Sequence, residues 1–238
     1  MTNDLQASKD KDGVHPRSSW ELLEVSVFLF LILPSMVLSF LVVKQGGLSF
    51  RLMAFATIAR DLGLVCLILY FLWRNVEPLY RIGWTLKSAW REVGLGIGLF
   101  IPFFFGAGAL ESALLAAGFS FPSTPLPSYL AAEGPVDLLL ALILVGVVAM
   151  AEETIFRGYL MLRFQPLTAS PTAAVLLSAV IFSLGHGYEG SAGVITVGAM
   201  GVVFALVYLW RQSLIAPIVM HFLQDFVGIV LLPLLGKR

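Results

Sequence analysis

Long apolar stretches alternate with short polar ones along almost the whole chain. Each stretch is continuously apolar, and about 20 such residues are enough to cross a bilayer as a helix. A membrane barrel needs apolar and polar residues in alternation, a pattern that these stretches lack. We therefore predict an all-α fold, a polytopic membrane helical bundle of about seven transmembrane helices, with limits of six and eight. The predicted spans are residues 20–43, 52–73, 92–117, 136–160, 171–187, 192–210 and 213–235.

Shifts in composition divide the chain into four parts. Residues 1–19 form a polar tail, in which His15 is expected to be exposed to solvent. Residues 20–117 hold the N-terminal transmembrane helices, 118–135 a proline-rich loop, and 136–235 the helices with candidate chemistry. The first apolar run follows a charged tail and is too long for the apolar part of a secretory signal.

The composition indicates an integral membrane protein and argues against some classes of partner. Of the 238 residues, 58% are hydrophobic and 13% charged, whereas a soluble domain is about 25% charged. The formal net charge is +0, so nothing indicates binding to nucleic acid. Cys66 is the one cysteine and lies in an apolar run. We expect it to be a buried, inert thiol outside any disulfide or thiolate metal cluster.

The lysines and arginines near the ends of the spans predict the orientation in the membrane. One side carries Lys44, Arg51, Lys237 and Arg238. The other side carries a larger set, with the densest loop: Lys9, Lys11, Arg17, Arg74, Arg81, Lys87, Arg91, Arg163 and Arg211. We expect the second side to face the cytoplasm, with the N-terminus there, in a plasma (inner) membrane.

The fourth span ends in AEETIFRGYL, residues 151–160, which places Glu152, Glu153 and Arg157 at the end of an apolar helix. Each ionisable group inside a bilayer costs roughly 2.5–3.5 kcal/mol on insertion scales and by default suggests a functional site. Glu153 and Arg157 are four residues apart and share a helix face, which predicts a structural ion pair. By the predicted orientation, this site opens toward the cytoplasm.

Other features of the apolar segments have a plainer interpretation. Arg60 and Asp61 interrupt the second span, and we expect an interfacial pair, with a paired site inside the bundle as the alternative. Glu111 is expected at the outer end of the third span, away from the site. Gly94 and Gly98 have the GxxxG spacing of closely packed helices.

The two remaining histidines also lie in apolar surroundings. His221 and Asp225 are four residues apart, so they share a helix face. If the fourth span continues to residue 167, Glu152 and His186 both lie 15 residues from the turn that joins their helices. At about 1.5 Å per residue, both are then about 22 Å from that turn and at one level. His221 is about eight residues past its own turn, so counting leaves it shallower. The alternative is that helix tilt, or a break at Gly185–Gly187, brings all three residues to one level.

A carboxylate and two histidines at one depth can hydrolyse an amide in two ways. The carboxylate, beside an imidazole, can take a proton from water and pass it to the leaving amine. A second histidine can then donate a hydrogen bond to the oxyanion. Alternatively, two histidines and one glutamate can bind zinc and leave a position for water.

The polar residues resemble the three motifs of the CPBP intramembrane proteases, which include the CAAX prenyl endopeptidases and relatives linked to bacteriocin processing and immunity. The matching patterns are Glu152-Glu153-x-x-x-Arg157, Phe182-x-x-x-His186 and His221-x-x-x-Asp225. Their order and separations match, and each lies in a different apolar run. The resemblance covers about residues 136–232.

This resemblance implies a role for each residue. Glu152 would activate the attacking water together with His186, while His221 and Asp225 would form the oxyanion pocket. The prenyl endopeptidases usually have Asn at the position of Asp225, and an ionised Asp only accepts hydrogen bonds. We therefore expect Asp225 to orient His221 or to favour its charged form. The resemblance also favours water activated by glutamate without a metal, and zinc is the alternative.

The leading hypothesis is an intramembrane endopeptidase that cleaves a peptide or protein near the membrane surface, with lipidated or hydrophobic peptides among the candidates. A non-catalytic membrane scaffold or bacteriocin-immunity protein of the same fold is the alternative. A small proton-coupled transporter is a third hypothesis, because intramembrane Glu and His also serve proton relays. The absence of an inverted repeat in the sequence argues against the transporter.

Overall fold

The computed structural model describes residues 17–42, 49–120 and 134–236. His15, nearly all of the predicted polar tail and most of the predicted proline-rich loop lie outside these residues. The described chain consists of helices and short connections, which confirms the all-α fold class and the polytopic membrane bundle.

The helices follow the predicted spans closely. They are α1 (Arg17–Val42), α2 (Phe50–Arg74), η1 (Leu79–Ile82), α3 (Ala89–Ala116), α4 (Pro135–Glu153), η3 (Thr154–Leu160), α5 (Met161–Thr168), α6 (Pro171–Leu184), η4 (Gly187–Glu189), α7 (Gly190–Arg211), α8 (Ile215–Asp225), η5 (Phe226–Leu231) and α9 (Leu232–Gly236). Four continuous stretches among the described residues are long and apolar enough to cross a membrane: Phe50–Arg74, Ala89–Ala116, Pro135–Thr168 and Gly187–Arg211.

Helix α6 is shorter than the predicted span at 171–187. It has 14 residues and ends at Leu184, so it is about 21 Å long. Gly185 and His186 form a turn, and η4 then leads directly into α7. A span needs about 30 Å of apolar length, so α6 by itself is too short to cross a bilayer of average thickness.

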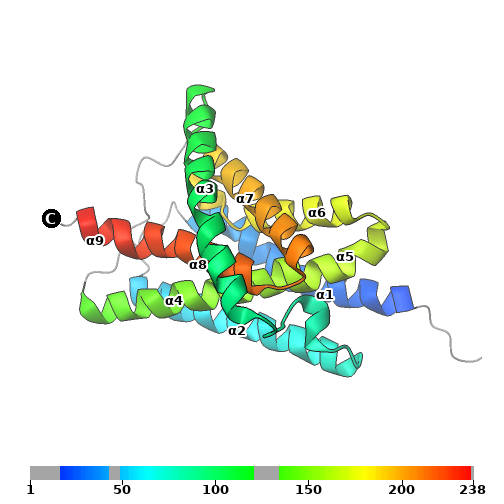
Figure 1. Ribbon diagram of the computed structural model, residues 1–238. Helices are drawn as coiled ribbons and strands as arrows, with labels where there is room; N and C mark the ends of the chain where they lie inside the picture. Colours follow the sequence, from blue (N-terminus) through cyan, green and yellow to red (C-terminus); the bar gives the residue numbers. More distant parts are fainter. Residues whose placement is uncertain (1–16, 43–48, 121–133, 237–238) are drawn as a thin grey trace, which may run out of the picture.

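Three helix pairs build the bundle (Figure 1). Helix α2 packs along α4, α6 packs on α7, and the long helix α3 crosses α8. The crossing depends on Gly96, where an added Cβ would lie 2.8 Å from the carbonyl oxygen of Ala216. Gly94 and Gly98 have nothing within 4 Å of such a Cβ, so the prediction of close packing at that pair is wrong. Gly96, between them, faces the partner helix.

Cys66 differs from the prediction as well, because it is exposed on α2. The apolar residues around it in sequence do not require burial inside the bundle, since the outer face of a membrane helix meets lipid. The buried residues of α2 lie on the opposite face, which packs on α4.

One end of the bundle is held by a network of five charged residues, called here the anchor network: Glu24, Arg74, Glu77, Arg81 and Arg163. Arg163 is 1% exposed and pairs with Glu77 at 2.5 Å and with Glu24 at 3.3 Å. Arg74 also binds Glu24, at 2.7 Å. The network therefore places the start of α1, the end of α2 and helix α5 on the same side of the molecule.

The connection that contains η1 docks onto the middle of the long α4–η3–α5 stretch. Gly83 has a φ of 81° and accepts a hydrogen bond at 3.0 Å from the backbone N–H of Leu214. An added Cβ on Gly158 would lie 2.9 Å from the carbonyl oxygen of Ile82 and 3.5 Å from Leu214. Gly158 is therefore the point where this connection, η3 and the turn before α8 meet.

Candidate active site

Glu152 and Glu153 are the last residues of α4, and the helix widens into the π-helical turn η3 directly after them. Turns of this kind leave backbone groups without their usual helical partners and often lie at functional sites. Here, neighbouring segments bind the altered backbone. The Ser178 hydroxyl of α6 donates to the carbonyl of Phe156 at 2.7 Å. The Trp84 indole donates at 3.1 Å to Thr154 Oγ1, which donates at 2.7 Å to the carbonyl of Met150.

Glu153 and Arg157 form an ion pair within this stretch, as their spacing predicts. Arg157 Nη1 lies 2.7 Å from Glu153 Oε1, and the two side chains are 1% and 0% exposed. The Arg157 guanidinium lies over the rings of Phe182, at 4.3 Å, and Phe204, at 5.2 Å. It also donates to the carbonyl of Gly201 at 3.4 Å. The pair thus joins η3 to α6 and α7.

The pair is not purely intrahelical, because Glu153 also binds His221 of α8. His221 Nδ1 lies 2.8 Å from Glu153 Oε1. A carboxylate that faces Arg157 accepts hydrogen bonds, so we assign Nδ1–H as the donor. Nε2 of His221 then faces two more carboxylates, Glu152 Oε2 at 3.7 Å and Asp225 Oδ2 at 3.5 Å. We call these five residues, Glu152, Glu153, Arg157, His221 and Asp225, the candidate catalytic cluster, or the catalytic cluster for short.

The contact between His221 and α4 corrects the expectation that His221 lies shallower than Glu152. The turn before α8 is buried, and Leu214 packs beside Gly158. Glu152 lies six residues before Gly158 and His221 lies seven residues after Leu214, about 9 and 10 Å along their helices. Counting from the turn failed because this turn does not reach the level of the turn between α5 and α6.

His186 lies just after α6, in the turn that leads to η4. Its Nδ1 is 3.2 Å from the carbonyl oxygen of Phe182, and a carbonyl only accepts, so Nδ1–H is the donor. In this tautomer of the neutral ring, Nε2 is the nitrogen with the lone pair. The Phe182 ring contacts His186 at 5.0 Å and His221 at 5.9 Å between ring centroids. Phe182, the other residue of the second motif, therefore packs against both histidines.

Asp225 is the last residue of α8, and a second π-helical turn, η5, follows it. Its carboxylate interacts electrostatically with His221, Glu152 and His186. Both helices that carry carboxylates of the cluster therefore widen immediately after those residues. The long distance of 3.5 Å between Asp225 and His221 suits an electrostatic contact better than a short hydrogen bond.

Arg60 and Asp61 lie in the middle of α2, so the expectation of an interfacial pair is wrong. The second span begins at Phe50 and not near residue 62. Asp61 is 1% exposed and interacts electrostatically with Glu152 and His221, and Arg60 interacts with Glu152. The alternative interpretation, a paired site inside the bundle, agrees with this position.

Glu111 also lies nearer to the site than expected. It interacts electrostatically with Glu189, which in turn interacts with His186 and Glu152. Gly193 leaves the space that Glu189 occupies, because an added Cβ would lie within 3.1 Å of a Glu189 carboxylate oxygen. Sequence patterns did not single out Glu189. Its position three residues before the apolar run that begins at Ala192 was the available signal.

The zinc alternative can be tested against the arrangement of the donors. It requires Glu152 and Nε2 of both His186 and His221 to converge on one ion. Nδ1 of His221 is held by Glu153 and Nδ1 of His186 by a backbone carbonyl, which leaves Nε2 of each histidine available as a ligand. Among the described residues, no group of three or more His, Cys, Asp or Glu side chains is arranged to hold a metal ion. The residues present do not fit the zinc set, and we derive no step through a metal.

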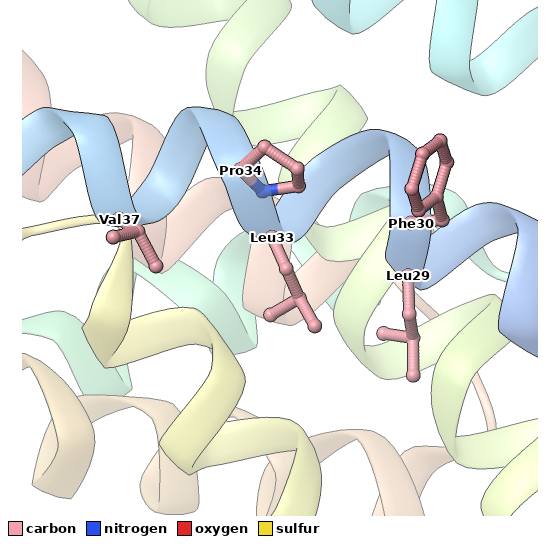
Figure 2. Close-up of a pocket in the computed structure, with 5 residues that line it drawn as sticks. All are labelled: Leu29, Phe30, Leu33, Pro34 and Val37. Atoms are coloured by element: carbon pink, nitrogen blue, oxygen red, sulfur yellow. The ribbon is translucent and has the colours of Figure 1, made fainter.

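An open hollow on α1 is a separate feature (Figure 2). Leu29, Phe30, Leu33, Pro34 and Val37 line it, and all five come from α1. It carries no ionisable side chain, so it contributes no chemistry to the catalytic cluster. Its apolar lining is typical of a helix face that meets lipid.

Several carboxylate oxygens near the cluster have no hydrogen-bond partner within the described part of the chain. They are Glu152 Oε2, Glu153 Oε2 and Asp61 Oδ2, all inaccessible to solvent. A buried polar atom without a partner costs about 1–3 kcal/mol, more for a charged group. Such atoms mark a place that water or a substrate can occupy with a gain in hydrogen bonds.

Comparison with known protein families adds one finding. Residues 134–227 match the model of the Rce1-like family, described as type II CAAX prenyl endopeptidase Rce1-like. The matched range begins at α4 and contains every residue of the catalytic cluster together with His186. Helices α1 to α3 lie outside it. No curated protein and no solved structure matches the chain.

Proposed function

We propose that this chain, whose residues 134–227 match the model of the Rce1-like family, is an intramembrane endopeptidase that uses water activated by a carboxylate. The family supports a protease, and four long apolar stretches support an integral membrane protein. The residues that we assign to the chemistry are Glu152, His186, His221 and Asp225.

One observation carries the proposal. Glu153, itself held by Arg157, fixes Nδ1 of His221 at 2.8 Å and so directs Nε2 toward Glu152 at 3.7 Å. A buried carboxylate that orients an imidazole beside a reacting group is a recurring arrangement in hydrolytic enzymes. The oxygen of Glu152 that faces this imidazole has no other hydrogen-bond partner among the described residues.

In the proposed reaction, Glu152 accepts a proton from water while the water oxygen attacks the carbonyl carbon of the scissile peptide bond. His221, with protons on both nitrogens, donates from Nε2 to the developing oxyanion. Glu152 then passes its proton to the amide nitrogen, and the carbon–nitrogen bond breaks. The products are a new carboxyl terminus and a new amino terminus, and the enzyme returns to its starting protonation state.

His186 and Asp225 support this step in different ways. Nε2 of His186 carries a lone pair, so it can accept a hydrogen bond from the attacking water and orient it. Asp225 interacts electrostatically with both histidines, which makes it the acidic group between them. We assign it the role of holding His221 rather than of donating to the oxyanion.

The substrate in this proposal is a flexible peptide or protein that reaches the site from the membrane, with lipidated and hydrophobic peptides as the first class to test. The side of entry follows from the anchor network, which shares its end of the bundle with the loop rich in Lys and Arg between α2 and α3. We propose that this end faces the cytoplasm. A thiol introduced as Lys87→Cys should then react with an impermeant maleimide only in inverted vesicles.

The test of the activity compares new protein termini in membranes from cells that express the wild type or Glu152→Ala at matched levels. Asp137→Asn is the matched control, because Asp137 lies at the other end of α4 and pairs with Arg51 at 2.6 Å. We expect termini that appear with the wild type and the control and that are absent with Glu152→Ala.

Identical termini in all three samples would reject the protease. If Glu152→Ala also restored a phenotype that depends on the wild-type protein, the hypothesis of a non-catalytic scaffold would replace that of a protease. Some termini that depend on the protein could disappear with a zinc chelator and return with added zinc. That result would keep the protease activity and replace the proposed mechanism with one that uses zinc.

A further inference from the structure

Helix α2 lies outside the matched family range, yet it brings a buried carboxylate to the catalytic cluster. Ala54, Asp61 and Ile68 repeat at intervals of seven residues and form a buried stripe together with Phe50 and Leu72. Phe50 and Ala54 pack on α4, the helix that carries Glu152, whereas Ile68 and Leu72 pack with residues of α1 and η3. Asp61 is thus an ionisable residue in the middle of an otherwise apolar stripe.

Arg60 is bound back onto Asp61 although adjacent helical residues point about 100° apart. Its Nε and Nη2 both lie 2.8 Å from Asp61 Oδ1. The Arg60 side chain is 46% exposed and Asp61 is 1% exposed. Asp61 Oδ2 has no hydrogen-bond partner among the described residues, so the pair leaves one buried acceptor beside α4.

Both members of the pair act on Glu152. Asp61 interacts electrostatically with Glu152 and His221, and Arg60 interacts with Glu152 and with Tyr188 of η4. The charged or titratable groups that interact with Glu152 come from four elements besides α4: Arg60, Asp61, Arg157, Glu189, His221 and Asp225. Arg60 and Asp61 are the members of this set that α2 supplies.

A role in helix packing alone does not explain the pair. A buried ion pair is often no more stabilising than apolar residues of the same size, and an ionisable group at mid-span is costly. Helices α2 and α4 are also joined by a second pair of the same chemistry, Arg51 with Asp137 at 2.6 Å, near the start of both helices. Asp137 lies 15 residues before Glu152 in α4, about 22 Å along the helix, so this second pair is a natural control.

We propose that Arg60 and Asp61 are a positioning pair for Glu152, which keeps one charge of each sign beside the carboxylate that activates water. The cation stabilises Glu152 while it is ionised, and the adjacent anion balances that cation so that Glu152 can still accept a proton. The inference rests on the proposed function, because it assigns the pair to the base of that reaction. It extends the catalytic centre to α2.

The test measures how readily Glu152 is protonated, without a substrate. Dicyclohexylcarbodiimide adds to protonated carboxylic acids inside membrane proteins and leaves a stable N-acylurea, which peptide mass spectrometry locates to a single residue. Labelling of Glu152 is followed against pH in the full chain in detergent. The samples are the wild type, Asp61→Asn, Arg60→Gln and the control Asp137→Asn.

The expected result is a pair of shifts of opposite sign. Asp61→Asn leaves the Arg60 cation unbalanced, so half-maximal labelling of Glu152 should move to lower pH by about one unit. Arg60→Gln leaves the Asp61 anion unbalanced and should move it to higher pH by a similar amount. Asp137→Asn should not move it. If the pair served only in packing, both substitutions would destabilise the protein and would not shift the labelling of Glu152 in opposite directions.

The inference would be overturned if the pH of half-maximal labelling of Glu152 stayed within about 0.3 unit of the wild type. It would also be overturned if this pH moved in the same direction in both variants. Arg60 is half exposed, so Arg60→Gln decides the question alone if Asp61→Asn does not fold. If the pH of half-maximal labelling of Glu152 in Arg60→Gln is then unchanged or lower than in the wild type, the proposed role of the pair is rejected.

The proposed function fails by a separate observation. If wild-type membranes contain no termini that depend on Glu152, the chain is not the proposed protease, whatever the labelling shows. If such termini exist, a quenched fluorescent peptide that spans one of them gives kcat and KM. Asp61→Asn should then lower kcat at neutral pH about tenfold or more and leave KM within about twofold, because the pair acts on the base and not on substrate binding.

Discussion

The anchor network and the catalytic cluster are both built from buried carboxylates and arginines, but they differ in how the carboxylate oxygens are used. In the anchor network, all four oxygens of Glu24 and Glu77 have a partner from Arg74, Asn75, Arg81 or Arg163. In the catalytic cluster, Glu152 and Glu153 each keep one buried oxygen without a partner among the described residues, and so does Asp61 beside them.

Under the proposed function, this difference separates a structural network from a reactive cluster. A network whose carboxylate oxygens are all paired has no free acceptor for a substrate, and it is destabilised when one partner is lost. A cluster with free buried acceptors costs stability, which is commonly found where a protein carries out chemistry. The two regions should therefore respond in opposite ways to the loss of a carboxylate charge, with stability affected in one and activity in the other.

The largest effect is expected from Glu152→Gln. Removal of the general base should lower cleavage about 1,000-fold, with little change in the thermal unfolding of the purified protein. Glu77→Gln is the comparison, since it removes a carboxylate charge from the anchor network. It should lower the unfolding temperature and leave the activity of the folded fraction near that of the wild type. Equal loss of activity in both variants would contradict the distinction between the two regions.

Arg163→Leu should have the next largest effect, which we expect on the stability of the protein and not on its activity. It leaves Glu77 and Glu24 with unpaired buried charge, which costs about 3–5 kcal/mol when one partner of a buried pair is lost. Unfolding by denaturant in detergent measures this loss of folding free energy. The control is Arg81→Leu, because Arg81 binds the same Glu77 but its side chain is 45% exposed. Its loss should cost less than about 1 kcal/mol.

Asp225→Asn should change cleavage less than about tenfold. Asn can still accept near His221, and the contact at 3.5 Å is longer than a normal hydrogen bond. Asp225→Leu removes both charge and acceptor and should lower kcat/KM by about 100-fold. If Asp225→Asn were as damaging as Glu152→Gln, Asp225 would take part directly in proton transfer.

Ser178→Ala should have the smallest effect. It removes the donor to the carbonyl of Phe156 in η3, a buried contact at 2.7 Å, and should cost about 1 kcal/mol of folding free energy. Ser183→Ala is the control on the same helix, because the Ser183 hydroxyl bonds only locally, to the carbonyl of Val180. A larger loss of activity than of stability in Ser178→Ala would show that the π-helical turn positions Glu152.

Much of the bundle could be predicted from the chain itself. The ends of the long helices follow from where the apolar runs stop, as at Arg74 and Arg211, since hydration of charged residues ends a span. The pair of Glu153 and Arg157 follows from helical spacing alone. Both depend on local properties, and both agree with the structure.

What could not be predicted depends on contacts between distant segments. The level of His221 is set by the packing of Leu214 beside Gly158, which no count along one helix contains. The widening of η3 depends on Ser178 and Trp84, donors from other parts of the chain. The burial of Asp61 inside the bundle could have been predicted. Its spacing of seven residues from Ala54 and from Ile68 places it on the buried face of a helix that begins at Phe50.

The short helix α6 has a consequence for the lipid around the protein. Leu176, Leu177 and Val180 are exposed along it, so this side of the bundle offers the acyl chains an apolar wall of about 21 Å. An average hydrocarbon layer is about 30 Å thick, and the resulting hydrophobic mismatch favours a locally thinned bilayer. In such a thinned bilayer, polar headgroups and water come closer to the turn of His186, at the end of α6, than they do in a bilayer of average thickness.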